Sequence, residues 1–595
     1  MALHSDMQSI VRILAALTIV SGTVQAATLT VSPATATVAP GASRQFKAAV
    51  DGASNTAVTW LVNGIPGGAP SLGLISSTGL YTAPVEPSAP TKVEIEAQSV
   101  AAPLASGAAS VTPKPLTYIH PGFSVATTGS DANDGSAAHP WRTIQHAMNT
   151  AKGGSIVAVA SGVYNEIVTI RHSGSAKGLT ILTAAKGAHP VIDGTGLAIP
   201  NDEYGLITLN NVSFVRISGF EIRNYTSTSA ALDPIGIYIV GAGGNIQILN
   251  NRIHDIRTTG KTDNFDALGI AVYGTAAPAS LNRIVIDGNE LDHLVTGFSE
   301  SLALTGNVQY FQVTGNLIHD NDNIGIDVSG YEQVSPQVAY DRARNGYVAR
   351  NTVYNITSLH NPAYRGQESA DGIYIEGGAE VVVERNLVHN TDLGIEVASE
   401  HAGRVSQAVT VRSNIVYAST QVGISIGGYA RTVGGTSLCT IVNNTLYGNG
   451  TAPSSEGEFQ IQFNAAGNLF ENNIAEADNA QDQLLYSFVA TPAHPATLNG
   501  DLYFSPGGAN NSNWEWTGKN YATFAGYQAR TGNDAASHFA DPKFVAPSTF
   551  NFHLAAGSPA RGAGISLPLS TVGLFDFAGK ARRSTGGIDV GADQD

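Results

Sequence analysis

Cysteine is almost absent from the sequence, which has a single one, Cys439, in 595 residues. One cysteine excludes a disulfide within the chain, so the fold has to be stabilised by packing, for which this length is ample. Cys439 lies in the strand-like phrase Leu438-Cys-Thr-Ile441. We interpret it as a small buried apolar residue rather than as a reactive thiol.

Charge is also scarce, and positive charge most of all. Charged residues make up 13% of the chain, and 31 basic residues stand against 47 acidic ones, which gives a net charge of −16. This balance argues against nucleic acid as a partner. Lysine is missing altogether between Lys261 and Lys519, so any chemistry in the middle of the chain has to proceed without one.

Apolar runs are short, and the one near the start of the chain, Ile13–Val20, is the most informative. It follows Arg12 and leads to small residues around Ala26, an arrangement that is typical of a secretory signal and too short to span a membrane. We therefore predict a signal peptide over residues 1–26, a secreted or periplasmic mature protein, and no membrane span.

The clearest pattern that is present is a repeated phrase of asparagine followed by alternating apolar residues. It recurs in steps of 38, 27, 35, 35, 28, 30 and 29 residues, at Asn251, Asn289, Asn316, Asn351, Asn386, Asn414, Asn444 and Asn473. Short strands of period two at such spacing are typical of stacked repeats. They predict an all-β parallel solenoid with three strands per coil, in which the asparagines stack inside one turn.

Residues 27–114 have a different pattern, with alternating strands such as Thr28–Val31, Gln45–Val50 and Val58–Val62 separated by turns. This segment resembles the bacterial immunoglobulin-like domains of exported proteins, with Trp60 as the expected core tryptophan. We predict an independent immunoglobulin-like β-sandwich here, followed by the stiff linker Pro113–Pro115.

Three phrases open the solenoid: DGSAAHPWRTIQHA at 134–147, GGSIVAVASGVYNE at 153–166 and HPVIDGTG at 189–196. They resemble the opening of right-handed parallel β-helix proteins of the pectate-lyase-like superfamily, a group dominated by polysaccharide lyases and glycoside hydrolases. The resemblance covers residues 116–595 and implies a capping segment at about 500–595. It also implies a secreted carbohydrate-active enzyme with a polysaccharide or oligosaccharide substrate. Apolar spacing further predicts a helical cap at 140–151 that starts at Pro140.

Alternation within three coils places one row of side chains outward. In GIDV at 325–328, GIYI at 372–375 and GIEV at 394–397 the apolar residues point inward, so Asp327, Tyr374 and Glu396 form an outward column. The loops 330–345 and 355–371 flank these coils. We expect a solvent-exposed acidic strip framed by long loops, which is where sites are usually built.

Carboxylates on adjacent rungs suit the hydrolysis of a glycosidic bond, which needs one acid to protonate the leaving oxygen and one carboxylate to attack or to activate water. We predict Glu396 as the central catalytic residue, with Asp371, Glu376 and Asp327 as candidate partners. The predicted substrate-binding residues are Tyr374, Arg365, Glu400, His401, Arg344 and Tyr364. No repeated histidine or cysteine spacing predicts a metal site.

Two alternatives stay open. Acidic clusters also bind calcium, and the resemblance includes lyases that use calcium to acidify a uronate. Without a lysine, such a lyase would need an arginine base, for which the candidates are Arg342, Arg344, Arg365 and Arg404. The second alternative is a non-catalytic carbohydrate-binding or adhesin β-helix. The hydrolase interpretation requires no cofactor, and calcium is left open.

Overall fold

The structure, a computed structural model, describes residues 28–595 except for 39–42, 53–55, 57, 70–71, 76–78, 85–91, 100–104, 114–121, 263, 453–454, 489–493, 574, 581 and 583–586. The predicted signal peptide at 1–26 and two of the three linker residues, Lys114 and Pro115, lie outside the described residues.

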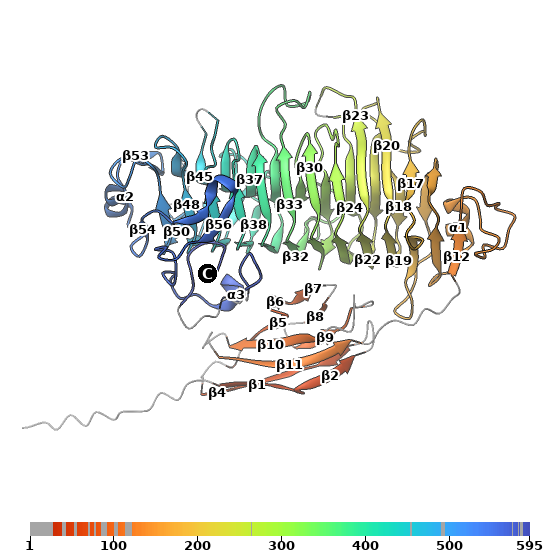
Figure 1. The fold of residues 1–595 in the computed structure, drawn as a ribbon, viewed down its shortest axis with the longest axis horizontal. Coiled ribbons are helices and arrows are strands. Elements are labelled where there is room, and N and C mark those ends of the chain that lie inside the picture. The colour runs from red at the N-terminus through yellow and green to blue at the C-terminus, as the bar shows by residue number, and fades with distance from the viewer. Residues whose placement is uncertain are drawn as a thin grey trace, which may run out of the picture.

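Residues 122–539 wind into a right-handed parallel β-helix with three long sheets (Figure 1). Sheet 1 has 17 strands, from β12 (Gly122–Val125) to β50 (Ala496–Asn499), and sheet 2 has 13, from β14 (Gly162–Tyr164) to β54 (His538–Phe539). Sheet 3 has 13 strands: β15 (Val168–Ile170), β18 (Glu203–Asn210), β21 (Asp233–Val240), β24 (Leu268–Gly274), β27 (Leu302–Gly306), β31 (Ile326–Val328), β34 (Asp371–Glu376), β37 (Leu393–Ala398), β41 (Val422–Gly427), β45 (Gly457–Ile461), β49 (Gln483–Ser487), β52 (Asn513–Trp516) and β53 (Lys519–Tyr521). The predicted fold class is confirmed.

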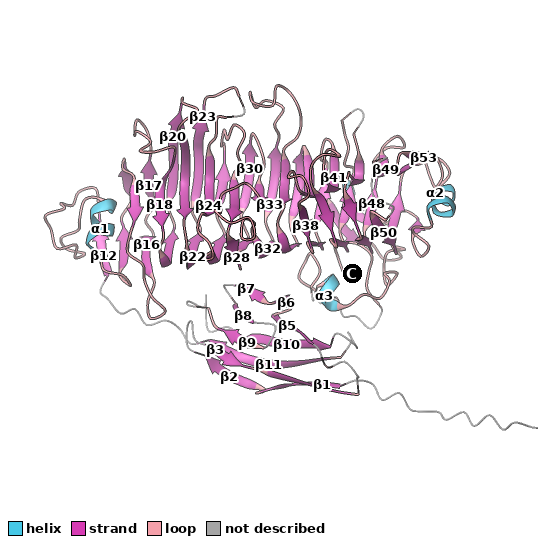
Figure 2. Cartoon of the chain, turned by 180° about the vertical axis from the view of Figure 1, so that it is seen from behind, coloured by secondary structure: helices cyan, strands magenta, loops and turns pink. Residues whose placement is uncertain are grey.

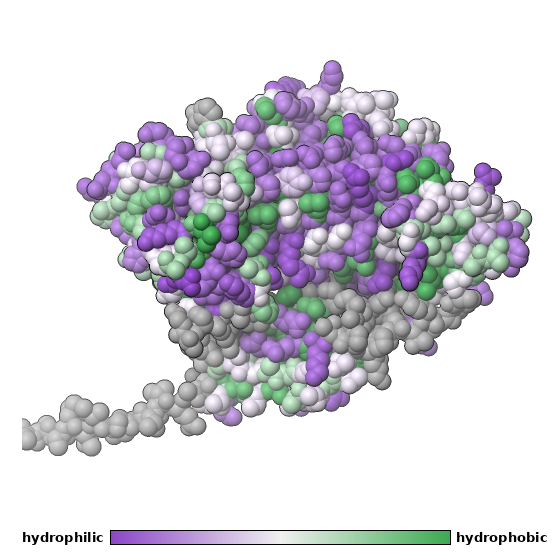
Figure 3. Space-filling view, viewed as in Figure 1, coloured by the Kyte–Doolittle hydropathy of each residue, from purple (hydrophilic) through white to green (hydrophobic). Residues whose placement is uncertain are grey.

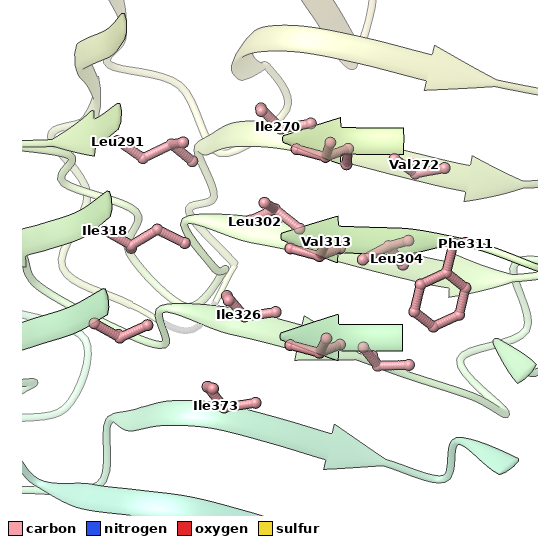
Figure 4. Packing of buried hydrophobic residues seen from close by; sticks show 14 of the residues in the cluster. Ile270, Val272, Leu291, Leu302, Leu304, Phe311, Val313, Ile318, Ile326 and Ile373 are labelled. Atoms are coloured by element: carbon pink, nitrogen blue, oxygen red, sulfur yellow. The ribbon is translucent and has the colours of Figure 1, made fainter. Parts of the chain in front are cut away.

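The interior of the coils is a stack of aliphatic side chains. In sheet 3, Ile270, Leu302, Ile326 and Ile373 follow one another in register on successive coils, and each is 0% exposed. Figure 4 shows this row beside the buried side chains of the neighbouring sheets. Since side chains alternate along a strand, this inner row also determines which residues of sheet 3 point outward.

The asparagines stack as the repeat predicts. The backbone N–H and the Nδ2 of Asn351 both donate to Oδ1 of Asn386, at 3.0 and 2.9 Å, and Asn386 donates in the same way to Asn414. The ladder ends where Asn473 donates to Oδ1 of Asp501. Each amide therefore satisfies buried backbone groups of its neighbour, which makes the row structural rather than catalytic.

Helices lie at the two ends of the stack of coils (Figures 1 and 2). Helix α1 (Ile144–Thr150) lies within the predicted helical cap and buries Ile144, Ala147 and Met148. It is capped by Thr143, whose hydroxyl accepts a hydrogen bond from the backbone N–H of His146, so the helix starts later than the expected Pro140. Helix α2 (Phe524–Thr531) packs on β52 at the other end, where Tyr527 stacks on Trp514 with ring centroids 4.9 Å apart.

The remaining C-terminal residues do not close the end of the coils. Phe544, Phe552 and Val590 are buried against Ile415 and Leu502, which belong to β40 (Ile415–Tyr417) and β51 (Leu502–Phe504) of sheet 2. The segment therefore runs back along the outside of sheet 2 and covers apolar side chains there. The expected capping segment at about 500–595 thus combines an end cap with a lateral cover.

Residues 28–113 form sheets of their own, drawn outside the stack of coils in Figure 2. The largest contains β2 (Thr35–Val38), β11 (Ser106–Pro113), β10 (Val93–Ser99), β5 (Val58–Val62) and β6 (Ile65–Pro66). Trp60 is 5% exposed and shares a separate core with Phe46 and Tyr81. Among the described strands, none of this region pairs with the coils. The immunoglobulin-like assignment and its boundaries stay predictions.

The face of the coils shown in Figure 3 is predominantly hydrophilic. Within the described part of the chain, no helix combines the length and the hydropathy that crossing a bilayer requires.

Candidate active site

Sheet 3 carries the predicted outward row. Asp327 of β31 is in register with Tyr374 of β34, which is in register with Glu396 of β37 and then with Ser425 of β41. Parallel neighbours lie about 4.8 Å apart, so these side chains stand on successive rungs of one ladder. Asp371 opens β34 and Glu376 closes it, which places both predicted partners on the rung between Asp327 and Glu396.

The predicted exposure of this row is wrong. Asp327 and Asp371 are each 3% exposed, Tyr374 is 4% exposed and Glu396 is 7% exposed. The side chains leave the coil outward, as predicted, but other parts of the chain cover them. The site is therefore a pocket with buried carboxyl groups at its floor rather than an open strip.

Two loops that build the walls are fixed by buried aspartates. Asp392 accepts hydrogen bonds from the backbone N–H groups of Ser358 and Ala370, at 2.8 and 3.0 Å, and so closes the loop between β33 (Thr352–Ile356) and β34. Asp341 accepts from the backbone N–H groups of Gln333 and Ser335, at 2.7 and 2.8 Å, and shapes the loop after β31. Neither loop contains a repeated or alternating sequence pattern from which its conformation could be predicted.

The pocket has a volume of about 660 Å³ and is lined mainly by acids and aromatic rings. Its acids are the five predicted ones, Asp327, Asp371, Glu376, Glu396 and Glu400, and three that the sequence did not single out as site residues, Glu203, Glu300 and Glu332. Its aromatic side chains are Tyr273, Phe298, Tyr364, Tyr374 and Tyr429. No lysine or arginine is among the described residues that line it.

Glu396 is held in place by hydrogen bonds, and its surroundings raise its pKa. Its Oε1 accepts hydrogen bonds from Nε2 of Gln462 at 2.8 Å and from Oγ of Ser425 at 3.3 Å. Burial, followed by the charge of Glu400, raises the pKa of Glu396 to about 7, although the two hydrogen bonds act in the opposite direction. At neutral pH this carboxyl is thus poised to donate a proton.

The neighbouring acids are also hard to ionise. Burial is the main cause that raises the pKa of Asp371, and the charge of Glu396 comes next. For Asp327 and Glu376, too, burial and nearby carboxylates raise the pKa. Among the described residues, none donates a hydrogen bond to Oδ1 of Asp327 or to Oδ1 of Asp371, although both atoms are buried. An unpaired buried carboxyl oxygen of this kind can accept a hydrogen bond from water or from a ligand.

The pKa of Glu400 is raised as well, chiefly by burial, but two groups oppose the rise. Burial raises its pKa, but the hydroxyl of Tyr374 donates to its Oε1 at 3.2 Å, and that hydrogen bond and the charge of His401 both lower the pKa. His401 in turn lies 3.8 Å from Glu376 and forms a closer pair with Glu332 through the same ring nitrogen. These groups connect β34 with the loop after β31 and the loop after β37 at one side of the pocket.

Glu332, Glu376 and His401 are also the pocket residues that come closest to a metal-binding group. Their ligand atoms lie within 4.8 Å of one another. Two carboxylates and an imidazole suit zinc or another transition metal better than calcium, which takes oxygen ligands. His401 and Glu332 already pair with each other without an ion.

Two predicted binding residues lie outside the pocket. Arg365 is exposed and has a backbone φ of 55°, and Arg344 lies on β32 (Arg344–Ala349) of sheet 1, where it donates to Asn307 and Gln309. Tyr364, in contrast, lines the pocket and stacks on Phe298 with ring centroids 5.1 Å apart.

The other two candidate arginine bases are engaged elsewhere. Arg342 donates to the carbonyl groups of Gly378 and Val405, and its guanidinium lies over the ring of Tyr331. The guanidinium of Arg404 also lies over the ring of Tyr331, 5.0 Å from its centroid. Like Arg344 and Arg365, neither is a lining residue of the pocket.

The residues that the sequence interpretation missed come from outside the repeated phrases. Glu203 and Tyr273 lie on earlier coils, Glu300 precedes β27, and Gln462 follows β45. Strand register could have identified part of this set. Tyr273 is in register with Thr305, and Thr305 lies on the coil before the acidic rungs. The positions of Glu300 and Glu332 depend on how their loops fold back, which periodicity does not show.

Comparison with known proteins places these coils in a defined class. Residues 123–268 match the family model described as Pel9A-like, right handed beta helix region. The chain is 36% identical over 437 residues to the uncharacterized protein YwoF of Bacillus subtilis (strain 168), which covers 73% of this chain and 91% of that protein. The chain belongs to the same family as YwoF.

The chain also has more distant similarities. The chain is 22% identical over 363 residues to pectate lyase PEL9 of Emericella nidulans, covering 57% of this chain and 81% of that protein. Among solved structures, XylC in complex with xylose has a TM-score of 0.47 at 12% identity and covers 79% of this chain and 98% of its own. Pectate lyase Pel9A has a TM-score of 0.43 at 13% identity and covers 80% and 97%.

Proposed function

We propose that the protein is an exported carbohydrate-active enzyme that hydrolyses glycosidic bonds of a polysaccharide or oligosaccharide, with Glu396 as the proton donor. The observation that carries the proposal is the state of Glu396, a buried carboxyl with a pKa raised to about 7, fixed by Gln462 and Ser425 at the floor of an acidic pocket. Such a group can protonate a leaving oxygen at neutral pH.

The second role in hydrolysis requires a carboxylate that stays charged. We assign it to Glu400: burial raises the pKa of this group too, but the hydroxyl of Tyr374 and the neighbouring His401 favour its ionised form, and its charge raises the pKa of Glu396. Protonation of the leaving oxygen by Glu396 and activation of water, or direct attack, by Glu400 would complete the reaction. Asp371, Glu376 and Asp327 remain candidate partners, and the aromatic rings of the pocket offer faces for sugar rings.

The similarity to PEL9 and Pel9A, whose names describe pectate lyases, keeps the lyase alternative in view. A calcium-assisted lyase needs a base, and among the described residues of the pocket lining neither lysine nor arginine supplies one. Among the described lining residues, His401 is the one basic side chain. The hydrolase proposal therefore expects new reducing ends without the ultraviolet absorbance of an unsaturated sugar, and no loss of activity on chelation.

The test of Glu396 is the substitution Glu396→Gln, assayed on glycans that the parent protein cleaves. Because glutamine keeps the shape but carries no transferable proton, turnover should fall by at least about 10²-fold. The matched control is Glu380→Gln, which removes one negative charge from an exposed residue of β35 (Ala379–Glu384) on sheet 1. If the folded Glu396→Gln protein keeps full activity, the assignment of the proton donor is wrong.

A further inference from the structure

The ionisable side chains that line the pocket are almost all acidic. Eight carboxyl groups line it, and among the described lining residues the one basic side chain is His401. The whole chain carries a net charge of −16, so no distant surplus of positive charge compensates this field. Where these groups are ionised, a polyanionic chain such as a polyuronate would meet repulsion from most of the lining, whereas a cationic group would favour their charged form and lower their pKa.

The pocket also offers acceptors without donors. Oδ1 of Asp327 and Oδ1 of Asp371 are buried and accept no hydrogen bond from any described residue, and both side chains line the pocket. Oε1 of Gln462, beside Glu396, is unpaired in the same way within the described part of the chain. Unpaired acceptors on residues that line the pocket favour a ligand rich in donors and poor in acceptors.

The spatial spread of the carboxylates argues against one bound metal ion as that ligand. Within the described residues, the pocket group whose ligand atoms converge within 4.8 Å is Glu332, Glu376 and His401. Asp327, Asp371 and Glu396 do not converge in this way but stand on successive rungs of sheet 3. A row of separated acceptors suits a row of separate cationic groups along a chain.

We propose that the glycan bound here carries protonated amino groups, as a polysaccharide of de-N-acetylated hexosamine units does; this substrate class rests on the proposed function. An ammonium group supplies three donors and no acceptor, which matches the unpaired oxygens of Asp327 and Asp371. The exposed rings of Phe298 and Tyr429, 46% and 57% exposed, add faces that attract cations and sugar rings.

The test measures binding by titration calorimetry, so that it does not depend on turnover. The Glu396→Gln protein is titrated, in a chelator and at low salt, with hexamers of glucosamine and of galactosamine, with their N-acetylated counterparts, and with a galacturonate hexamer. At least one amine hexamer should bind about tenfold or more tightly than its N-acetylated counterpart. The advantage should shrink as salt is added, because screening weakens charge contacts.

Charge-matched variants identify the pocket as the source of the preference. Glu300→Gln should weaken binding of the amine hexamer several-fold and leave binding of the N-acetylated hexamer unaffected. The reason is that Glu300 lines the pocket and interacts electrostatically with Asp327. Glu332→Gln, at a more exposed position, provides the same test if Glu300→Gln does not fold. The control Glu380→Gln on sheet 1 should change neither affinity.

Two results would overturn the amino-sugar inference. One is that neither amine hexamer binds more tightly than its N-acetylated counterpart; the other is that the galacturonate hexamer becomes the tightest ligand once calcium is added. Hydrolysis of a neutral glycan together with the first result would leave the proposed function intact. Tight binding of an amine hexamer that the unsubstituted protein never cleaves would support the substrate class and refute the hydrolase proposal.

Discussion

Single residues of the pocket differ in what surrounds them rather than in their own chemistry. Glu396 and Glu400 belong to one segment of the chain. Glu396 is buried and accepts hydrogen bonds from Gln462 and Ser425, whereas Glu400 accepts one from the hydroxyl of a tyrosine and lies beside His401. Different environments of this kind separate the proton donor of a glycosidase from its charged partner. The alternation of GIEV predicted the direction of Glu396, but it contains nothing about Gln462, which lies two coils further along.

The raised pKa of Glu396 makes stability depend on pH. Its ordinary value is 4.5 and its value in the fold is about 7, so the protonated form is favoured by folding and its contribution is lost as pH rises from about 5 to 8. Glu396→Gln does not titrate and should therefore be more stable than the parent at pH 8, by roughly 1–3 kcal/mol, with the difference shrinking toward pH 4. Urea unfolding across this pH range measures it; a constant difference would contradict the shift.

Tyr374→Phe isolates the hydrogen bond that favours the charged form of Glu400. The ring stays, but the donor at 3.2 Å is lost, so the pKa of Glu400 should rise. If Glu400 has to be ionised, the acidic limb of kcat/KM should move to higher pH, and turnover on that limb should fall by about tenfold. An unchanged limb with lower activity at every pH would assign Tyr374 to sugar binding alone.

At the scale of elements, the coils are specified by a repeat and the pocket walls are not. Eight asparagines at steps of 27 to 38 residues were enough to predict the sheets, because each coil must place one amide on the next. The walls depend on Asp341 and Asp392, which bind backbone groups of their own loops. Such contacts depend on loop conformation, so the sequence predicted that loops frame the site but not that they bury it.

Asn386→Ala tests the ladder. The substitution removes the acceptor of two donors of Asn351 and the amide that donates to Val348 and Asn414, all of them buried. Leaving several buried groups unpaired should lower the free energy of unfolding by about 3 kcal/mol or more. Asn520→Ala, at an exposed position of β53, is the control and should change it by less than about 0.5 kcal/mol. Equal effects in chemical denaturation would mean that the ladder is not a source of stability.

At the scale of the whole molecule, the end caps and the C-terminal segment shield different surfaces of the solenoid. Helices α1 and α2 cover the two open ends, where unpaired strand groups would otherwise invite another chain. The C-terminal segment covers Ile415 and Leu502 on the outside of sheet 2 and leaves the pocket side, sheet 3, free. The resemblance predicted a closing segment but not its path. The segment follows sheet 2 because apolar side chains of that sheet point outward, and a local sequence pattern does not distinguish such residues from those of the core.

The N-terminal sheets should be dispensable for catalysis. None of the described residues that line the pocket belongs to 28–113, and the described strands of that region pair only among themselves. A chain that begins at Leu116 should therefore turn over a small soluble substrate within about twofold of the full-length rate, because long-range effects on a rigid site are small when no contact is shared. The comparison needs circular dichroism and a melting curve to show that the shortened chain keeps its coils. A folded truncation that has lost activity would mean that residues 27–114 take part in the site, and activity lost on insoluble glycan alone would assign them to substrate attachment.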